Sequence, residues 1–461
     1  MMRTLAVVVL VAQLGVAQPN IVLFYADDLG WRDLACMGSK FYDTPHIDRL
    51  AAEGMLFTDA YANAPNCAPS RACLMSGQYT PRHGVFTVGA PNRGRAALRR
   101  LIAVENKTVL DQRFVTMAES LKRAGYRTAT MGKWHLGDDP TTQGFDLNVG
   151  GFKAGHPKSY FSPYKNPKLQ DGAQGEYLTD RLTDAAVSFI REKDERPFFL
   201  YLTHYAVHTP LQAKQDDMAR FADRQPDRGQ KNKKYAGMVY ALDRSMGRVL
   251  EALKAAGKAE DTLVVFFSDN GGHMGATSCK PLRGAKGTLY EGGIRVPMIV
   301  RWPGKVKAGS RSATPVIGVD LYPTFLSAAG AKRPEGYTLD GEDITPVFKG
   351  QVSLVDRPLF WHFPAYLQGR FEKDMFRTRP GAVVRRGKWK LIEFFEDKRL
   401  ELYDLSQDRG EKANVAATHP DVTRELHALM ATWRLETGAP VPTKANPKFD
   451  PDAKPMRRGG E

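Results

Sequence analysis

The sequence predicts an α/β fold: a large, mostly parallel sheet between helices, plus a small C-terminal subdomain with an antiparallel sheet and a helix. Two observations predict it. Up to about residue 345, short strand-like segments, most of them continuous apolar runs, alternate with helix-like segments, as in sheets covered on both faces. Beyond that point, short strand-like runs with close turns precede one last helical segment. That order is typical of an antiparallel sheet packed by a helix.

Strands and helices alternate along the N-terminal part. The predicted strands are residues 21–26, 127–131, 198–202, 262–267 and 294–300, and the predicted helices are residues 45–53, 116–124, 176–192 and 235–256. The first helix has the clearest ends, with Thr44 as N-cap, Pro45 at its first position and Gly54 as its stop. Parallel neighbours need such crossover helices, so the alternation favours a parallel sheet.

The C-terminal part contains shorter elements. Its predicted strands are residues 359–363, 382–386, 389–394 and 400–403, and its predicted helix is residues 420–435. We therefore expect a larger domain at residues 18–345 and a C-terminal subdomain at residues 346–440. Residues 441–461 are rich in Pro, Lys and Gly, and we expect them to form a loose tail.

The first residues have the pattern of an export signal. Arg3 supplies a positive end, residues 5–11 an apolar run, and Gly15-Val16-Ala17 a small-residue cleavage site. The apolar run is too short to span a bilayer. We predict that residues 1–17 are a signal peptide and that the protein is periplasmic or secreted, not an integral membrane protein.

Two acidic pairs follow predicted strands. Asp27-Asp28 comes directly after the first strand, and Asp269-Asn270 follows the strand at residues 262–267. Sites in open α/β sheets form outside the carboxyl ends of strands, so both pairs are expected at one edge. Three crowded carboxylates repel one another unless a cation lies among them, and oxygen ligands favour Ca²⁺ or Mg²⁺. Each pair by itself is also compatible with capping a loop or helix.

A cysteine lies at a predicted helix start. Pro69 suits the first position of a helix that ends near Gly77, which places Cys67 where backbone N–H groups favour an anion. Arg71 adds a positive charge. A structural cysteine is the alternative for Cys67 taken alone. The chain has 4 cysteines, too few for a disulfide framework, and Cys73 is expected on the opposite side of this helix from Cys67.

Further cationic and imidazole groups follow the other strands. In an extended segment after residues 127–131, Lys133 and His135 share a face. His208 follows the strand at residues 198–202, and Lys286 lies in a Gly-rich loop that can bring its ammonium group close to an oxyanion. Other histidines are expected to be ordinary core or surface residues: His83, His204 and His273.

Taken together, these motifs resemble the type I sulfatase family of the alkaline phosphatase superfamily, on its arylsulfatase A and N-acetylgalactosamine-6-sulfatase branch. The resemblance runs from Pro19 to about Asn414. It begins with the maturation signal Cys67-Ala68-Pro69-Ser70-Arg71, followed by Leu74, Ser76 and Gly77. It extends to Pro19-Asn20-Ile21-Val22, Asp27-Asp28-Leu29-Gly30, Thr44-Pro45-His46-Ile47-Asp48, Gly132-Lys133-Trp134-His135-Leu136-Gly137, Ser268-Asp269-Asn270-Gly271, Gly287-Thr288-Leu289-Tyr290-Glu291-Gly292-Gly293 and Tyr403-Asp404-Leu405. An ordered set of motifs is far more specific than any single one.

The resemblance implies an alkaline phosphatase-like fold, one calcium ion and a modified cysteine. Cys67 would be converted to formylglycine by a formylglycine-generating enzyme, and its hydrate would attack sulfur. The implied calcium ligands are Asp27, Asp28, Asp269 and Asn270.

The resemblance also implies roles for the remaining residues. Arg71 and Lys133 would hold and polarise the hydrate, and His135 would take a proton as sulfate leaves. His208 and Lys286 would bind sulfate and assist the leaving alcohol.

The leading hypothesis is therefore a sulfuric ester hydrolase that acts on a sulfated carbohydrate or an aryl sulfate. One alternative is a phosphomonoester, phosphodiester or phosphonate hydrolase of the same superfamily. Another is a secreted glycan-binding protein with an inactive site, which requires Cys67 to remain a thiol.

The charge fits an anionic partner. The formal net charge is +15, which suits polyanions, and no nucleic-acid-binding motif accompanies it, so we expect a sulfated glycan and no nucleic acid. A solvated basic surface would give the same charge. Four arginines cluster after the predicted helix at residues 69–77; they fit a solvated loop or, alternatively, a subsite for a second sulfate or carboxylate: Arg93, Arg95, Arg99 and Arg100.

Overall fold

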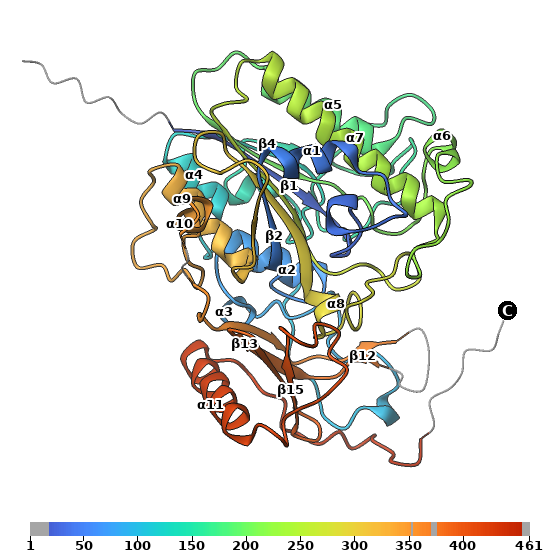
Figure 1. The fold of residues 1–461 in the computed structure, drawn as a ribbon, viewed down its shortest axis with the longest axis vertical. Coiled ribbons are helices and arrows are strands. Elements are labelled where there is room, and N and C mark those ends of the chain that lie inside the picture. Colours follow the sequence, from blue (N-terminus) through green and yellow to red (C-terminus); the bar gives the residue numbers. More distant parts are fainter. Residues whose placement is uncertain (1–17, 352–353, 370–375, 454–461) are drawn as a thin grey trace, which may run out of the picture.

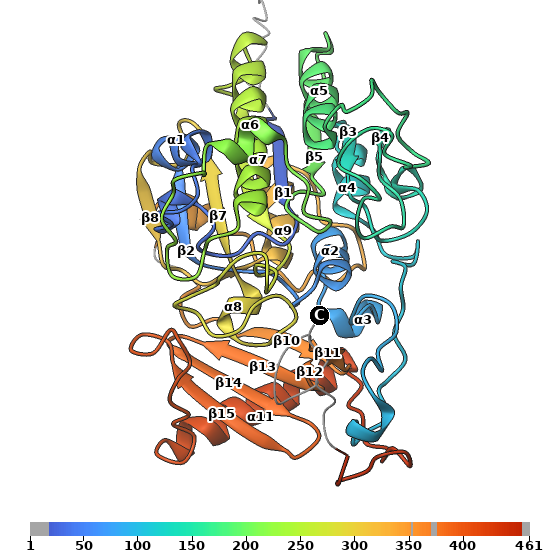
Figure 2. The ribbon, with the colours of Figure 1, turned by 90° about the vertical axis from the view of Figure 1, so that its right-hand side faces the viewer.

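The computed structural model describes residues 18–351, 354–369 and 376–453, and the predicted signal peptide lies outside them. Figures 1 and 2 show a larger α/β part and, below it, a smaller sheet covered by one helix. This is the predicted fold class. The domain limits themselves stay predictions. Among the described residues, no helix is both long and apolar enough to cross a membrane.

The larger part is built on a nine-stranded sheet in the order β4-β3-β5-β1-β6-β7-β2-β8, with β9 paired to β2. Strands β4, β3, β5, β1 and β6 are mutually parallel, while β7 is antiparallel to both β6 and β2. The mostly parallel sheet is thus confirmed. The strands are β1 Asn20–Ala26, β2 Met55–Tyr61, β3 Arg127–Gly132, β4 Leu147–Val149, β5 Phe198–Thr203, β6 Thr262–Ser268, β7 Arg295–Arg301, β8 Ser310–Ser312 and β9 Val316–Ile317.

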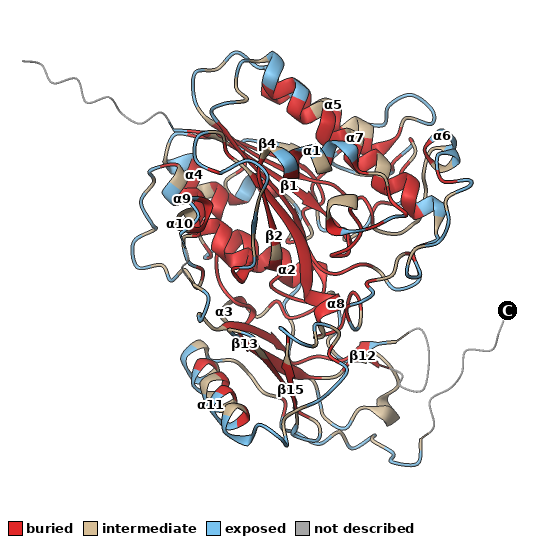
Figure 3. Cartoon of the chain, in the orientation of Figure 1, coloured by how far each residue is buried: buried red, intermediate tan, exposed pale blue. Residues whose placement is uncertain are grey.

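Helices cover both faces of this sheet, so its central strands are buried on both sides (Figure 3). Val22 and Phe24 of β1 pack into one core with α1, α5 and α7. Leu23 and Tyr25 pack into a second core with α2, α4 and α9. The helices are α1 Pro45–Glu53, α2 Cys67–Ser76, α3 Thr80–His83, α4 Met117–Arg123, α5 Leu178–Arg191, α6 Gln215–Ala219, α7 Lys233–Ala255, α8 Glu291–Ile294, α9 Leu321–Ala328 and α10 Thr345–Phe348.

The C-terminal part is an antiparallel sheet in the order β10-β13-β14-β15, packed by helix α11. All four strands and the helix predicted here are confirmed. A two-stranded sheet, β11 with β12, lies beside it. The elements are β10 Leu359–Phe363, β11 Leu367–Gln368, β12 Phe376–Thr378, β13 Gly381–Arg386, β14 Trp389–Phe394, β15 Arg399–Asp404 and α11 Pro420–Thr437.

Thr44 is the N-cap residue of α1, as predicted, but its hydroxyl accepts a hydrogen bond from Ala35 N–H and none from the helix backbone. Asp243 of α7 accepts from Ile47 N–H instead, across the core. One local prediction is wrong. The described tail residues 441–453 are not loose, because they pair with residues 96–102 through contacts such as Asn446 N–H to Arg100 O, 2.9 Å.

A buried ion cluster joins the two parts of the molecule. Lys390 of β14 contacts Glu291 of α8 at 3.0 Å and Glu411, after β15, at 2.8 Å. Arg295 of β7 also pairs with Glu291. The Lys390 side chain is fully buried, so its charge is needed to neutralise the two carboxylates in the same low-dielectric region.

We expect Lys390→Met to destabilise the fold by about 3–5 kcal/mol, because it leaves two buried carboxylates without their shared cation. The midpoint of urea unfolding measures the effect. Lys388→Met is the matched control, since the Lys388 side chain is 53% exposed beside Asp404; it should cost no more than about 1 kcal/mol. Equal midpoints for the two variants would contradict the expectation.

Candidate functional site

The predicted site residues meet at the carboxyl edge of the central strands. Asp27 and Asp28 follow β1, and Asp269 and Asn270 follow the adjacent strand β6. Asp28 N–H donates to Asp269 Oδ1 at 3.1 Å, and Asn270 Nδ2 donates to Asp28 Oδ1 at 2.9 Å. The structure therefore brings the two distant acidic pairs together, as their positions after parallel neighbours predict.

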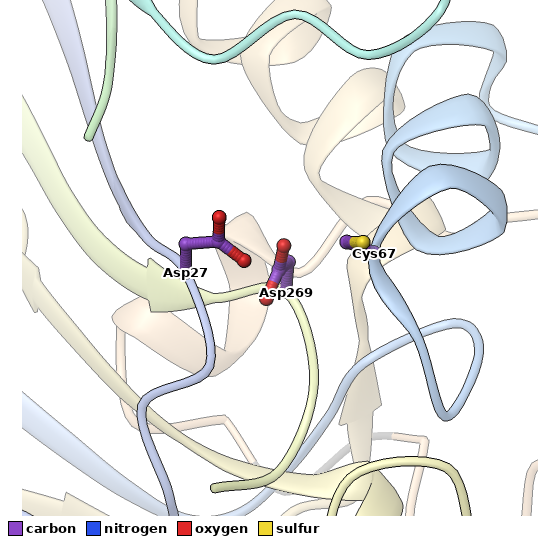
Figure 4. A group of neighbouring side chains, drawn as sticks. All are labelled: Asp27, Cys67 and Asp269. Carbon is purple, nitrogen blue, oxygen red and sulfur yellow. The ribbon is translucent and has the colours of Figure 1, made fainter. Parts of the chain in front are cut away.

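Cys67 lies at the start of α2, beside the acidic cluster (Figure 4). The helix begins at Cys67 itself, two residues before the predicted start at Pro69, because Asn66 is the N-cap. Its predicted stop is confirmed: Gly77 has φ 66, the left-handed conformation that glycine adopts readily. Cys67 is 3% exposed, so a group at this position sits at a helix N-terminus largely shielded from water.

The acidic cluster has the composition of a hard-cation site. All four side chains are fully buried: Asp27, Asp28, Asp269 and Asn270. Among the described residues, Asp27 Oδ1, Asp28 Oδ2 and Asn270 Oδ1 have no hydrogen-bond partner. Burial and the neighbouring Asp269 raise the pKa of Asp27 well above its ordinary value, although Lys133 lowers it. Orphaned buried oxygens and crowded carboxylates fit a calcium ion.

Each carboxylate also has its own buried cation. Lys133 Nζ lies 2.7 Å from Asp27 Oδ2, Lys286 Nζ lies 2.5 Å from Asp28 Oδ1, and Arg71 lies 2.9 Å from Asp269 Oδ2. Lys133 follows β3, Lys286 lies in the loop before α8, and Arg71 is on α2. Three separate segments thus converge on the cluster from different sides.

Arg71 is held away from solvent. Its guanidinium donates to Lys133 O at 3.0 Å and to Thr203 Oγ1 at 2.5 Å, besides its bonds to Asp269. These bonds fix the Asp269 carboxylate in the cluster. The other predicted role of Arg71, to hold and polarise the formylglycine hydrate at residue 67, stays a prediction.

Two imidazoles lie beside the cluster. His135 has φ 64, so the chain is not extended there and the argument from strand alternation is wrong. Burial and the charge of Lys133 nevertheless lower the pKa of His135, and burial and Lys286 lower the pKa of His208 well below the ordinary value. His208 Nδ1 pairs with Thr209 O, while its Nε2 lies 3.7 Å from Asp28 Oδ2. Neutral imidazoles of this kind can accept a proton.

Residues 155 and 156 were not among the catalytic and metal-binding residues predicted from the sequence. Gly155 lies against the ring of His135: a Cβ atom there would be 2.4 Å from His135 Cε1. The His156 ring stacks on His208 with centroids 6.0 Å apart. A glycine in a loop and an exposed histidine carry no recognisable pattern, so only the fold identifies them.

Three histidines were not predicted to belong to the site: His83, His204 and His273. His204 is buried against Ser245 Oγ at 2.9 Å, and His83 against Cys73 Sγ at 3.3 Å, both as predicted. Burial raises the pKa of Asp28, but the charges of Lys286 and, to a smaller extent, His273 help to lower it below its ordinary value. All four cysteines are free thiols.

The comparison with known proteins decides the family. The sulfatase family model matches residues 19–331, more than half of the chain. The chain belongs to the sulfatase family. A model for the C-terminal part of N-sulphoglucosamine sulphohydrolase matches residues 285–436. This sulfatase is therefore a sulfuric ester hydrolase with the fold predicted above.

Relatives of known name and relatives of known structure support the same family assignment. A sulfatase of Formosa agariphila is 36% identical, over 92% of this chain and 90% of the relative. The mouse N-acetylgalactosamine-6-sulfatase is 35% identical, over 75% of this chain and 68% of the relative. The crystal structure of Ps i-CgsB has a TM-score of 0.77 and 34% identity, over 91% of this chain and 94% of that one.

Calcium is expected to stabilise the protein, because an ion that binds only the folded state raises the melting temperature by mass action. Asp27→Asn should weaken calcium binding by more than about 100-fold, since it removes a charged ligand. Titration calorimetry measures the affinity, and melting with and without calcium measures the stabilisation. Unchanged calcium affinity in this variant would contradict the ligand assignment.

Gly155→Ala is expected to lower kcat by about 10–100-fold, because the added methyl group displaces the His135 ring and misplaced catalytic groups lose rate steeply. Steady-state kinetics on 4-nitrophenyl sulfate measure it. Lys153→Ala is the control from the same loop, since the Lys153 side chain is 74% exposed. Equal kcat values for the two variants would show that Gly155 does not position His135.

Proposed function

We propose that this sulfatase removes sulfate from a sulfated carbohydrate, with Cys67 converted to formylglycine and one calcium ion bound by the acidic cluster. The observation that carries the proposal is the convergence of Cys67 with the buried acids and cations: ligand atoms of Asp27, Cys67 and Asp269 lie within 4.8 Å of one another. Formylglycine would supply the nucleophile, and calcium would neutralise charge on the sulfate oxygens.

The remaining residues act through charge and proton transfer. Lys133 and Lys286 place two ammonium groups beside the reacting sulfate, whose negative charge they balance. The lowered pKa of His135 keeps its imidazole neutral, so that it can take a proton from the residue-67 hydroxyl. The Nδ1–H of His208 donates to Thr209 O, so Nε2 of the neutral ring carries no proton; His208 would assist the leaving alcohol only after Nε2 has taken up a proton.

The substrate class follows from charge and relatives. The net charge of +15 favours anionic polymers. The mouse relative is an N-acetylgalactosamine-6-sulfatase, and Ps i-CgsB has been solved with k-i-k-neocarrahexaose, at 35% identity to this chain. These relatives support a sulfated glycan for this chain as well.

Maturation and location complete the proposal. A formylglycine-generating enzyme would act on the motif Cys67-Ala68-Pro69-Ser70-Arg71 before α2 folds, since Cys67 is buried in the folded chain. The leader predicted at residues 1–17 would direct the protein to the periplasm or the medium.

Mass spectrometry of the mature protein, recovered from the periplasm or medium of a host able to modify it, tests these points together. We expect an N-terminus at Gln18 and an aldehyde in place of the thiol at residue 67. Cys67→Ala should lose at least about 10⁴-fold in kcat, because it removes the nucleophile. Full activity with an unmodified thiol would refute the mechanism, and faster hydrolysis of 4-nitrophenyl phosphate than of the sulfate would favour a phosphatase.

A further inference from the structure

The four clustered arginines do not form a uniform solvated loop. Arg99 donates to the backbone oxygens of Asn92 and Gly94, both at 2.5 Å, and the Arg100 guanidinium stacks on Phe449. These two side chains therefore hold the loop and the C-terminal residues together. Arg93 has a different environment.

Arg93 carries a half-buried guanidinium that none of the acids in residues 18–351, 354–369 and 376–453 neutralises. Its Nε makes one long hydrogen bond, 3.4 Å, to Ala90 O, and within the described parts of the chain it forms no ion pair. The buried cations Arg71, Lys133 and Lys286 each have a carboxylate within 3 Å. Among the described residues, Arg93 is thus a cation near this site whose charge a ligand can neutralise.

The loop that carries Arg93 is fixed on several sides. Tyr366 N–H donates to Pro91 O at 2.7 Å, and Asn92 forms an isolated bridge with Tyr366. Gly94 has φ 87, and a Cβ atom there would lie 2.6 Å from the Phe376 ring of β12. A side chain on such a fixed loop is preorganised, which lowers the entropy cost of binding.

The same loop belongs to the surroundings of the active site. Burial lowers the pKa of Arg93, and the Cys67 side chain raises it. The β11–β12 pair that holds the loop also contacts the residue after Lys286: a Cβ atom on Gly287 would lie 3.1 Å from Arg377 Cδ. Arg93 therefore shares its supporting strands with the Lys286 loop.

We propose that Arg93 binds a second anionic group of the substrate, a sulfate or carboxylate on the sugar that bears the reacting sulfate or on its neighbour. The inference rests on the proposed function and names its substrate more closely: a glycan with at least two anionic groups near the cleaved ester. The reacting sulfate already meets Lys133 and Lys286. A guanidinium offers a planar fork that matches the oxygens of either anion.

The test compares ligands that differ in anionic groups, through their inhibition of 4-nitrophenyl sulfate hydrolysis. The probes are N-acetylgalactosamine 6-sulfate, N-acetylgalactosamine 4,6-disulfate and the unsaturated disaccharide of chondroitin 6-sulfate, which adds a carboxylate. Inhibition constants need no turnover of the sugars. The proteins are the matured wild type, Arg93→Gln, Arg93→Lys and, as a control for net charge, Lys388→Gln, at an exposed position outside this loop.

In the wild type, we expect at least one two-anion ligand to bind about 10–100-fold more tightly than the monosulfate, the range typical of a charged hydrogen-bonded contact. Arg93→Gln should abolish that advantage, Arg93→Lys should keep part of it, and Lys388→Gln should keep all of it. Which ligand gains, the disulfate or the disaccharide, identifies the anion.

Two results would overturn the inference: no advantage in the wild type, or an advantage that survives in Arg93→Gln. Both would leave the proposed function intact, since the wild type would still hydrolyse the aryl sulfate. A wild type with formylglycine verified at residue 67 that hydrolyses no sulfate ester would instead refute the proposed function, and this inference with it.

Discussion

The site depends on keeping three carboxylates buried within a few ångströms of one another. Like charges so placed would raise one another's pKa and repel, and burial makes water unable to screen them. Three cations from different segments neutralise these carboxylates, one for each acid: Arg71, Lys133 and Lys286. Oxygen atoms that are still unpartnered fit a divalent ion. The positions of α2, the loop after β3 and the loop before α8 follow from this balance of charge.

Much of this arrangement could be predicted from the sequence, because the relevant signals are local. Apolar runs define β1, β5 and β6, and polar residues directly after them must lie at one edge if the strands are parallel. That rule alone brings Asp27 and Asp269 together across 242 positions of sequence. The resemblance to sulfatases then supplied the chemistry, and the family model agrees with it.

What could not be predicted depends on contacts between distant segments. Thr44 is the N-cap residue of α1, but the side chain that accepts from the first turn is Asp243 of α7, which no local signal indicates. His135 lies beside the acids through a left-handed turn that strand alternation does not anticipate. Gly155 and the residues at 441–453 have their partners only in the folded chain. Local patterns specify elements, whereas packing specifies which side chains meet.

Side-chain charge pairs surround the acidic cluster, whereas backbone contacts hold the loop at residues 90–94. This difference explains why the type of reaction is easier to recognise from the sequence than the identity of the substrate. Each carboxylate of the acidic cluster is paired with a cation, so a change at any of these paired positions leaves a buried charge unpaired, and the residue types are tightly constrained. The loop at residues 90–94 is held largely through backbone oxygens, such as Pro91 O and Asn92 O. Backbone contacts of this kind tolerate many side chains. A substrate-facing residue on that loop can therefore vary without disturbing the reaction, and it leaves no motif in the sequence.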